Sequence, residues 1–451
     1  MFARDIRLAW HGLRRHPGLT VLTVITLAIG IGAALMAIAQ YHARAGHPIV
    51  WKENLIHAVM LDTRGPERDR EDARHPEYPP FQLTYRDAKA LHASGIPARS
   101  VMSYVSWQTV TPTGREFKPF NTAVRLTSAD FFDLFDVPFR YGSGWTREAD
   151  EAPEPTAVIS RGFNERLFGG ENSVGRLIEL DGKQYRVVGV LDTWLPMPKF
   201  YDLTNGNFDI PEDIYLPFGW ATARQIGSAG EVSCVTDGAA AKSFAEFLTS
   251  ECVWLQYWVE LRTNAEREHF QQFIDGYALN EKAHGRFPRP LNNRIVTVSQ
   301  WLAMNDVVGG ERRTELILAV LFLAVCILNT VGILLTQFLR NAPIAGLRRA
   351  LGATRADIVR QHLLHVTITS LTGGIFGALL AQIGLISVRW LTYAPSPGNS
   401  AEQLAVAQAL SRLDLPVLGI AVGLSLLTGL CAGLYPAWQI GRLAPAGFLK
   451  A

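Results

Sequence analysis

The residue types that usually carry chemistry are scattered along this sequence and do not fall in a catalytic spacing. The nucleotide-binding pattern G-x-x-x-x-G-K-[ST], the nucleophile pattern G-x-S-x-G and the zinc pattern H-E-x-x-H are all missing from it. His362 and His365 lie one helical turn apart, but no Cys/His zinc spacing accompanies them, and we interpret them as snorkelling or cytoplasm-facing histidines. We therefore expect this chain to have no catalytic residue, to hold no metal ion and to bind no cofactor itself.

Four long apolar runs dominate the sequence, and any functional residue is placed relative to them. They cover Gly18–Gln40, Leu316–Leu339, Val366–Val388 and Leu415–Ile440. Each exceeds the roughly 20 apolar residues that a helix needs to cross a hydrocarbon core. The first run ends in a sequence that resembles a signal-peptide cleavage site, but it is longer than the roughly 7–15 apolar residues of a signal peptide. We predict retained transmembrane helices at 17–42, 314–340, 361–388 and 415–440.

A basic segment, Arg340–Arg360, joins the second and third runs. It holds five arginines against one acid, and short loops with such an excess of Lys and Arg stay in the cytoplasm. Both termini then lie in the cytoplasm, with an amphipathic interfacial helix at 1–16, for which a solvated helix is the alternative, and a tail at 441–451. Residues 43–313 and the short loop 389–414 lie on the far side of the membrane.

The sequence of the basic segment at 341–360 predicts two helices separated by a turn. We expect a short helix, a turn at Gly352 and then a longer helix that rises into the membrane. Thr354 can cap this second helix, with Asp357 three residues further on. Pro343 should end or bend a helix ahead of the turn.

The pattern of strand and helix signals in residues 43–313 predicts a large α+β domain. Strand and helix signals alternate near both ends, at 55–62, 85–94, 100–110, 253–262, 265–283 and 294–299, followed by a helical lead at 301–313. Short strands with turns lie between them, including a hairpin at Asp181–Gly182. The first and last segments should pair, which predicts two subdomains with the β-rich insert projecting. The formal net charge of +2 and the absence of a basic–aromatic cluster give no indication of nucleic acid as a partner.

Two of the four cysteines, Cys234 and Cys252, fall in this domain. The predicted topology places them in an oxidising compartment, where disulfides persist. We predict a disulfide that closes a local insertion and contributes about 3 kcal/mol by loop closure, with two unpaired buried thiols as the alternative. Cys326 and Cys431 lie in apolar runs and are interpreted as unreactive thiols.

The sequence GLRRALGATRADIV resembles the cytoplasmic coupling segment of MacB/FtsX-type ABC transporter permeases, R-x-x-E-I-G-L-R-R-A-L-G-A-x-x-x-D-I. The matching residues, which this resemblance makes candidates for ATPase coupling, are Gly346, Leu347, Arg348, Arg349, Ala350, Leu351, Gly352 and Ala353. The family's Glu-Ile is replaced by Ile344–Ala345. We interpret this loss as a sign of a second, non-identical permease subunit; drift in a homodimer is the alternative.

The region from Arg125 to Leu191 resembles the periplasmic core domain of MacB-type permeases, through Phe131, Phe132 and Phe135 and the later stretch Tyr185–Val190. The C-terminal GLYPAWQIGRLAPAGFLK resembles the family's closing motif. Inside the spans, small residues such as Gly30 and Gly32 allow helices to approach closely, either between subunits or within one subunit.

The resemblance implies a non-catalytic permease of the bacterial inner membrane that works by mechanotransmission with a separate cytoplasmic ABC ATPase dimer, which would bind the ATP and Mg²⁺. Its partners would be a second permease subunit and, for efflux, a periplasmic adaptor and an outer-membrane channel. Two alternatives stay open: an FtsX-like signalling device that controls an envelope enzyme, and an extractor of the lipoprotein-release type. The transported substrate is not readable from the sequence.

Overall fold

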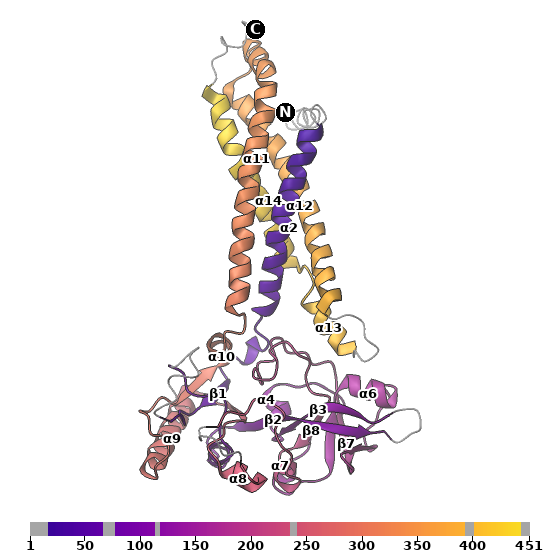
Figure 1. The fold of residues 1–451 in the computed structure, drawn as a ribbon, viewed down its shortest axis with the longest axis vertical. Coiled ribbons are helices and arrows are strands. Elements are labelled where there is room, and N and C mark those ends of the chain that lie inside the picture. Colours follow the sequence, from indigo (N-terminus) through magenta and orange to yellow (C-terminus); the bar gives the residue numbers. More distant parts are fainter. Residues whose placement is uncertain (1–16, 66–76, 113–117, 235–240, 393–400, 443–451) are drawn as a thin grey trace. The chain divides into compact units, whose positions relative to one another are not determined.

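The computed structural model describes residues 17–442 except for 66–76, 113–117, 235–240 and 393–400 (Figure 1). The predicted helix at 1–16, most of the charged loop after the first strand and most of the tail at 441–451 lie outside the described residues. The chain divides into two units, a large domain at Gly46–Val307 that also includes Asn399–Val406, and a unit made of the remaining residues. We call the four long helices of the second unit the span bundle.

The span bundle consists of α2 (Pro17–Arg44), α11 (Gly310–Ala350), α12 (Arg355–Thr392) and α14 (Leu415–Arg442), and α13 (Ala401–Ala409) precedes the last of these. Each of the four long helices contains a segment long and apolar enough to cross a membrane, which confirms the four predicted spans. The 41 residues of α11 correspond to a length of about 60 Å, roughly twice the hydrocarbon thickness of a bilayer. Figure 1 shows α2, α11, α12 and α14 as long neighbouring rods.

Glycines bring the bundle helices into close contact within one chain. A Cβ atom at Gly377 of α12 would lie 3.0 Å from the carbonyl oxygen of Ala28 and 3.1 Å from the amide nitrogen of Gly32, both in α2. A Cβ atom at Gly30 would lie 2.7 Å from that of Cys326 in α11. Both first-span glycines are therefore used inside the subunit, as one of the two predicted alternatives requires.

The large domain is built on one ten-stranded sheet, in the order β10-β1-β9-β2-β3-β8-β5-β7-β4 with β6 paired to β2 and β7. Its strands are β1 (Ile56–Met60), β2 (Arg99–Thr111), β3 (Phe120–Thr127), β4 (Phe139–Gly142), β5 (Thr156–Ile159), β6 (Leu177–Leu180), β7 (Lys183–Leu191), β8 (Ile214–Pro217), β9 (Gln256–Glu260) and β10 (Arg294–Thr297). Its helical segments are η1 (Val50–Lys52), α3 (Tyr85–His92), α4 (Phe131–Leu134), α5 (Glu148–Glu151), α6 (Arg161–Phe168), α7 (Gly219–Ala223), α8 (Phe244–Thr249), α9 (Asn264–Ala283) and α10 (Val298–Met304).

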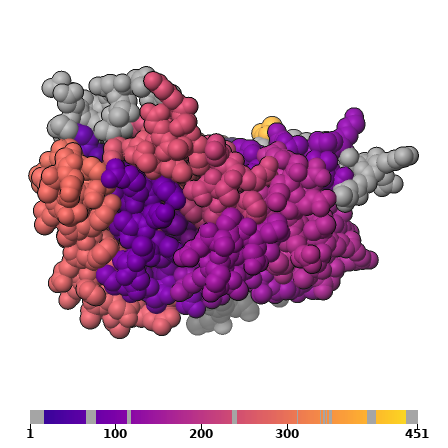
Figure 2. Space-filling model, turned by 90° about the horizontal axis from the view of Figure 1, so that it is seen from below, coloured from indigo at the N-terminus to yellow at the C-terminus, as the bar shows by residue number. Residues whose placement is uncertain are grey.

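The first and last segments of the large domain pair, as predicted. β1 lies between β9 and β10 and is antiparallel to both. In Figure 2 the early residues (indigo) lie against the late residues (orange) at the surface of this domain. The two predicted parts share one sheet, because the 13-residue β2 pairs with β9 over Arg99–Ser103 and with β3 over Ser103–Val110.

Both faces of this sheet are covered near its centre, and the core is therefore double. Successive residues of β9 alternate between two clusters: Tyr257 and Val259 belong to one, and Trp258 to the other. The first cluster includes Phe270 and Ile274 of α9. The second cluster is rich in aromatic side chains from α4, α10 and the segment before β8; it includes Phe131, Phe135, Tyr201 and Trp301. Aromatic rings and β-branched residues suit such a doubly covered sheet.

The predicted hairpin is confirmed. β6 and β7 pair antiparallel around Asp181 and Gly182, whose φ angles are +44° and +77°. Two positive φ angles are the mark of a primed turn, which glycine tolerates without strain.

The predicted continuous helical lead at 301–313 is wrong. A helix begins earlier, at Val298, because Thr297 and Gln300 form a capping box, and it ends at Met304. Asp306 and Gly309 then have φ angles of +44° and +74°, and α11 begins at Gly310. Left-handed backbone cannot continue an α-helix, so two helices stand where one was expected.

Candidate functional site

The basic segment forms the turn that joins α11 to α12. Helix α11 continues through Pro343 to Ala350, so the predicted separate short helix is the last part of α11 and the proline does not end it. Proline removes a single backbone donor, and the partner carbonyl at such a position can turn to solvent. Gly352 then adopts a φ of +99°, a left-handed conformation that favours glycine, and a Cβ atom added there would have no neighbouring atom within 4 Å.

The predicted cap of the second helix is confirmed. Thr354 Oγ1 donates to Asp357 Oδ2 at 2.6 Å and accepts from the Asp357 amide at 3.2 Å. The Thr354 amide in turn donates to Asp357 Oδ2 at 3.2 Å. This reciprocal arrangement satisfies amide groups that the first turn of α12 would leave without a partner, and it fixes the point at which α12 begins.

The predicted coupling residues gather in this turn. Leu347 and Leu351 are large apolar side chains with exposed fractions of 56% and 80%, and the Leu351 amide donates to the Leu347 carbonyl at 3.0 Å. Gly346 and Ala353 are half-buried. Arg348, Arg349 and Ala350 form the final residues of α11, and their side chains lie outside the described part of the structure. The arrangement offers two exposed leucines beside arginines, which suits docking to another protein. The coupling role of these residues stays a prediction.

Cys234 and Cys252 are joined by a disulfide in the structure. Ser233 and Val253, their neighbours on the chain, exchange two backbone hydrogen bonds of 3.0 and 2.8 Å, which place the two cysteines opposite each other. Residues 235–240, at the start of the enclosed stretch, lie outside the described residues. The bridge therefore closes the end of a segment that includes α8.

Arg286 ties this segment to the rest of the large domain. Its guanidinium group pairs with Glu251 at 2.7 Å, with Glu281 of α9 at 2.6 Å and with Asp87 of α3 at 2.9 Å. Burial lowers the pKa of Arg286, but hydrogen bonds and charge from these three carboxylates outweigh it and raise the pKa above its usual value. Glu251 directly precedes Cys252, so the disulfide-bonded segment is held by charge as well as by the covalent bond.

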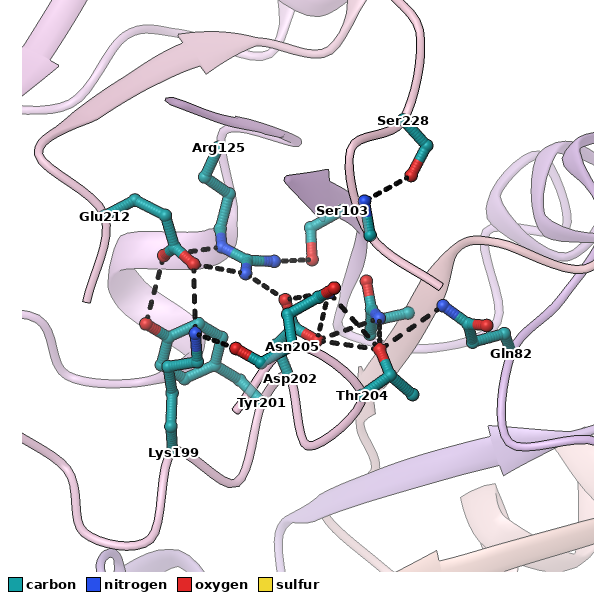
Figure 3. Close-up of polar contacts among 12 residues, drawn as sticks. Gln82, Ser103, Arg125, Lys199, Tyr201, Asp202, Thr204, Asn205, Glu212 and Ser228 are labelled. Atoms are coloured by element: carbon teal, nitrogen blue, oxygen red, sulfur yellow. Dashed lines mark hydrogen bonds and ion pairs between the residues drawn. The ribbon is translucent and has the colours of Figure 1, made fainter. Parts of the chain in front are cut away.

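A second ionic cluster is fully buried and was missed by the sequence analysis (Figure 3). Arg125 of β3 has no exposed side-chain surface; it donates to both oxygens of Glu212 at 2.9 and 2.7 Å and to Asp202. Lys199 adds a second positive charge, 3.4 Å from Glu212. We call Arg125, Lys199, Asp202 and Glu212 the buried ion cluster.

Charge balance stabilises the ionised forms in this cluster. Burial raises the pKa of Glu212, but the charges of Arg125 and Lys199 outweigh it and hold that pKa well below its usual range. Gln256 of β9 and Asn205 also donate to Asp202, at 3.0 and 2.8 Å. Because its charges are paired and inaccessible, the cluster fixes the segment before β8 onto the sheet and offers no reactive group. The only signal in the sequence was a charged residue within the otherwise apolar strand pattern around Arg125.

Within the described part of the chain, no three His, Cys, Asp or Glu side chains lie close enough to hold a metal ion. His362 and His365 both lie on α12.

The fold and this turn define a class: a multi-pass membrane protein with a large α+β domain between its first and second spans. The family described as MacB-like periplasmic core domain matches residues 20–275, more than half of the 451 residues, and the FtsX-like permease C-terminal family matches residues 316–445. The chain belongs to the MacB/FtsX-type family of ABC transporter permeases of the inner membrane.

Its relatives include the pyoverdine export ATP-binding/permease protein PvdT of Pseudomonas aeruginosa, 24% identical over 98% of this chain and 58% of the relative. The macrolide export ATP-binding/permease protein MacB of Rhodopirellula baltica is 24% identical over 97% of this chain and 61% of the relative. The chain thus spans about three-fifths of the length of these curated relatives. Among solved structures, the periplasmic region of MacB from Actinobacillus actinomycetemcomitans aligns with 58% of this chain and 97% of its own, with a TM-score of 0.36 and 12% identity.

Proposed function

We propose that this chain is the permease part of a MacB-like ABC transporter that works by mechanotransmission. An ATPase unit supplied from outside these residues binds ATP and Mg²⁺, its closure moves the turn between α11 and α12, and the helices carry that displacement across the membrane. Both chain termini would then lie in the cytoplasm, and the large domain on the opposite side. The relatives are named as exporters of pyoverdine and of macrolides, which supports efflux as the outcome.

The observation that carries this proposal is the exposed turn itself. Leu347 and Leu351 are exposed at the junction of two span-forming helices. In the sequence they lie between the candidate spans Arg312–Gln337 and Arg355–Leu391, and so outside both. The two leucines lie close together in one turn, and a contiguous exposed apolar patch commonly marks a contact with another protein. Among the described residues, the buried side chains of the bundle are mainly apolar or small. The polar ones among them are hydroxyl groups such as Ser370 and Thr428 and two glutamines, Gln40 and Gln337, and none of these described side chains is charged; this favours transmission of movement over a polar channel through one subunit.

Double substitution Leu347→Asp and Leu351→Asp tests the proposal. Measured with the ATPase that co-purifies with the full-length chain, permease-dependent ATP hydrolysis should fall to the level of the ATPase alone while expression persists. Leu279→Asp is the matched control, because Leu279 on α9 has a similar exposed fraction of 53% but lies in the large domain. Undiminished hydrolysis in the double variant would overturn the proposed coupling role.

The assembly partners decide between the proposed outcomes. We expect an ATPase dimer and a second, non-identical permease subunit, and for efflux a periplasmic adaptor with an outer-membrane channel. Native mass measurement of the purified complex gives the subunit composition, and two copies of this chain as the only permease would reject the heterodimer. Recovery of an envelope hydrolase in place of the adaptor would favour the FtsX-like signalling alternative.

A further inference from the structure

The connector between α2 and β1, residues 46–55, is a folded element of the large domain. Ile49 is only 2% exposed and belongs to the aromatic core cluster. The Ile49 amide donates to His47 Nδ1 at 3.3 Å, so a neutral His47 ring carries its proton on Nε2. His47 Nε2 lies 2.5 Å from Glu53 Oε2 and donates to it. The connector therefore closes on itself and presents the Glu53 carboxylate in a fixed position.

Glu53 reaches the helix through which the chain leaves the large domain. The Ser299 amide donates to both oxygens of Glu53, at 3.1 and 3.3 Å. Ser299 is the second residue of α10, and its amide has no partner within that helix. Thr297 accepts from the next amide, that of Gln300, at 3.4 Å. A residue 246 positions earlier in the chain thus completes the cap of α10.

The Glu53 contact is charge-assisted. Burial raises the pKa of Glu53, but hydrogen bonds from Thr297, His47 and Ser299 outweigh it and hold the pKa below its usual value. The carboxylate is therefore ionised at neutral pH. Hydrogen bonds to an ionised acceptor are stronger than those between neutral groups.

Lys52 anchors the same connector to the body of the domain. Its amine lies 2.6 Å from Asp136 Oδ1 and donates to the carbonyls of Asp133 and Leu134, at 2.8 and 3.0 Å. Trp51 Nε1 donates to Asp136 Oδ2 at 2.8 Å. A cation at the C-terminus of α4 is favoured by the unpaired carbonyls there.

α10 is equally well anchored. Its Trp301 is 2% exposed and donates from Nε1 to the Phe200 carbonyl at 2.9 Å. Beyond α10, Gly309 has a φ of +74°, and a Cβ atom added at Gly309 or Gly310 would have no neighbouring atom within 4 Å. The fixed residues thus stop just short of glycines, and Gly46 stands in the same place after α2. Glycine allows the backbone to change direction at both points.

We propose that Glu53 is a positioning residue that joins the two chain connections between the spans and the large domain. Displacements of α2 and α11 then enter the sheet together, at the neighbouring strands β1 and β10, instead of separately. This inference rests on the proposed mechanotransmission and names the residue that couples the two chain connections through which the large domain would receive the movement.

The test compares Glu53→Ala, Glu53→Gln and Glu266→Ala in the full-length chain with its co-purified ATPase in lipid nanodiscs. Glu266 is the matched control: its carboxylate accepts from the Arg262 amide at 2.7 Å at the start of α9, a cap with no link to a span connection. Hydrogen exchange is measured with and without the non-hydrolysable nucleotide AMP-PNP, and ATP hydrolysis is measured in parallel.

In Glu53→Ala, we expect the Ser299 amide to exchange about tenfold faster, as for the loss of a helix cap. The nucleotide-dependent change should no longer occur together and to the same extent in β1 and β10, while ATP hydrolysis stays within about twofold of the parent, since a cap contributes locally. Glu53→Gln keeps one acceptor oxygen and should show a partial loss, which covers the case in which Glu53→Ala does not fold. Glu266→Ala should speed exchange at the start of α9 only.

An unchanged nucleotide response in Glu53→Ala would overturn the role of Glu53, as would an equal loss in Glu266→Ala. Absence of any nucleotide response in the parent chain would contradict the proposed mechanotransmission itself, so the two failures are distinguishable.

Discussion

In the large domain, charged side chains are buried and paired across the sheet, whereas in the span bundle the closest contacts involve glycine and backbone atoms. Arg125 is fully buried between two carboxylates, while Gly377 lies against the backbone of α2. The difference follows from the solvent of each unit. Water drives apolar burial in the large domain strongly enough to offset the desolvation of a few paired charges.

A lipid environment offers no comparable gain for apolar side chains, because the lipid tails are as apolar as they are. Close packing and a small number of hydrogen bonds must hold the helices together there. Ser370 of α12 donates to the Ser425 carbonyl of α14, and a Cβ atom at Gly429 would lie 2.9 Å from Ser370. The comparison predicts that removal of a buried charge destabilises the large domain, and that a methyl group added at a closely packed glycine destabilises the bundle.

The largest effect is expected from Arg125→Met. It leaves Asp202 and Glu212 buried with only Lys199 to balance them, and removal of one partner of a buried ionic group typically costs about 3–5 kcal/mol. Denaturant unfolding of the full-length chain in detergent, followed by tryptophan fluorescence, measures the loss. Arg176→Met is the control, because the Arg176–Glu171 pair is exposed (49% and 75%) and should contribute less than about 1 kcal/mol. Equal losses in the two variants would contradict the importance of the buried ion cluster.

The two units also differ in the state of their cysteines. Cys234 and Cys252 are joined in the large domain, while Cys326 and Cys431 of the bundle are free. Maleimide should label two thiols in the unfolded, unreduced protein and all four cysteines after reduction. Reduction should lower the free energy of unfolding by about 3 kcal/mol, given the sequence separation of 18. Four labelled thiols without reductant would show the bridge to be absent.

The smallest effect tests the bundle. Gly377→Ala places a methyl group 3.0 Å from the Ala28 carbonyl oxygen, so α2 and α12 must move apart, at a cost of about 1–3 kcal/mol. Gly423→Ala in α14 is the matched control, since a Cβ atom added there would have no neighbouring atom within 4 Å. Thermal unfolding in lipid nanodiscs should show a lower midpoint for the first variant only. A similar decrease in both would mean that close approach at Gly377 does not stabilise the bundle.

Features that depend on contiguous residues could be predicted from the sequence. The four spans follow from uninterrupted apolar runs, the turn at Gly352 from a glycine before a Thr354–Asp357 cap, and the hairpin from Asp181–Gly182. The candidate coupling residues could be placed at one turn for the same reason, because they are contiguous in the sequence; their coupling role stays a prediction.

Contacts between residues far apart in the sequence became visible only in the folded chain. Arg125 and Glu212 are 87 residues apart, and Glu53 and Ser299 are 246 apart, and no local pattern relates the members of either pair. The continuation of α11 through Pro343 and the break between α10 and α11 could not be predicted from local propensity either. Propensity describes the preference of a segment in isolation, whereas the fold brings a buried charge to its partner and an unpaired amide to its acceptor.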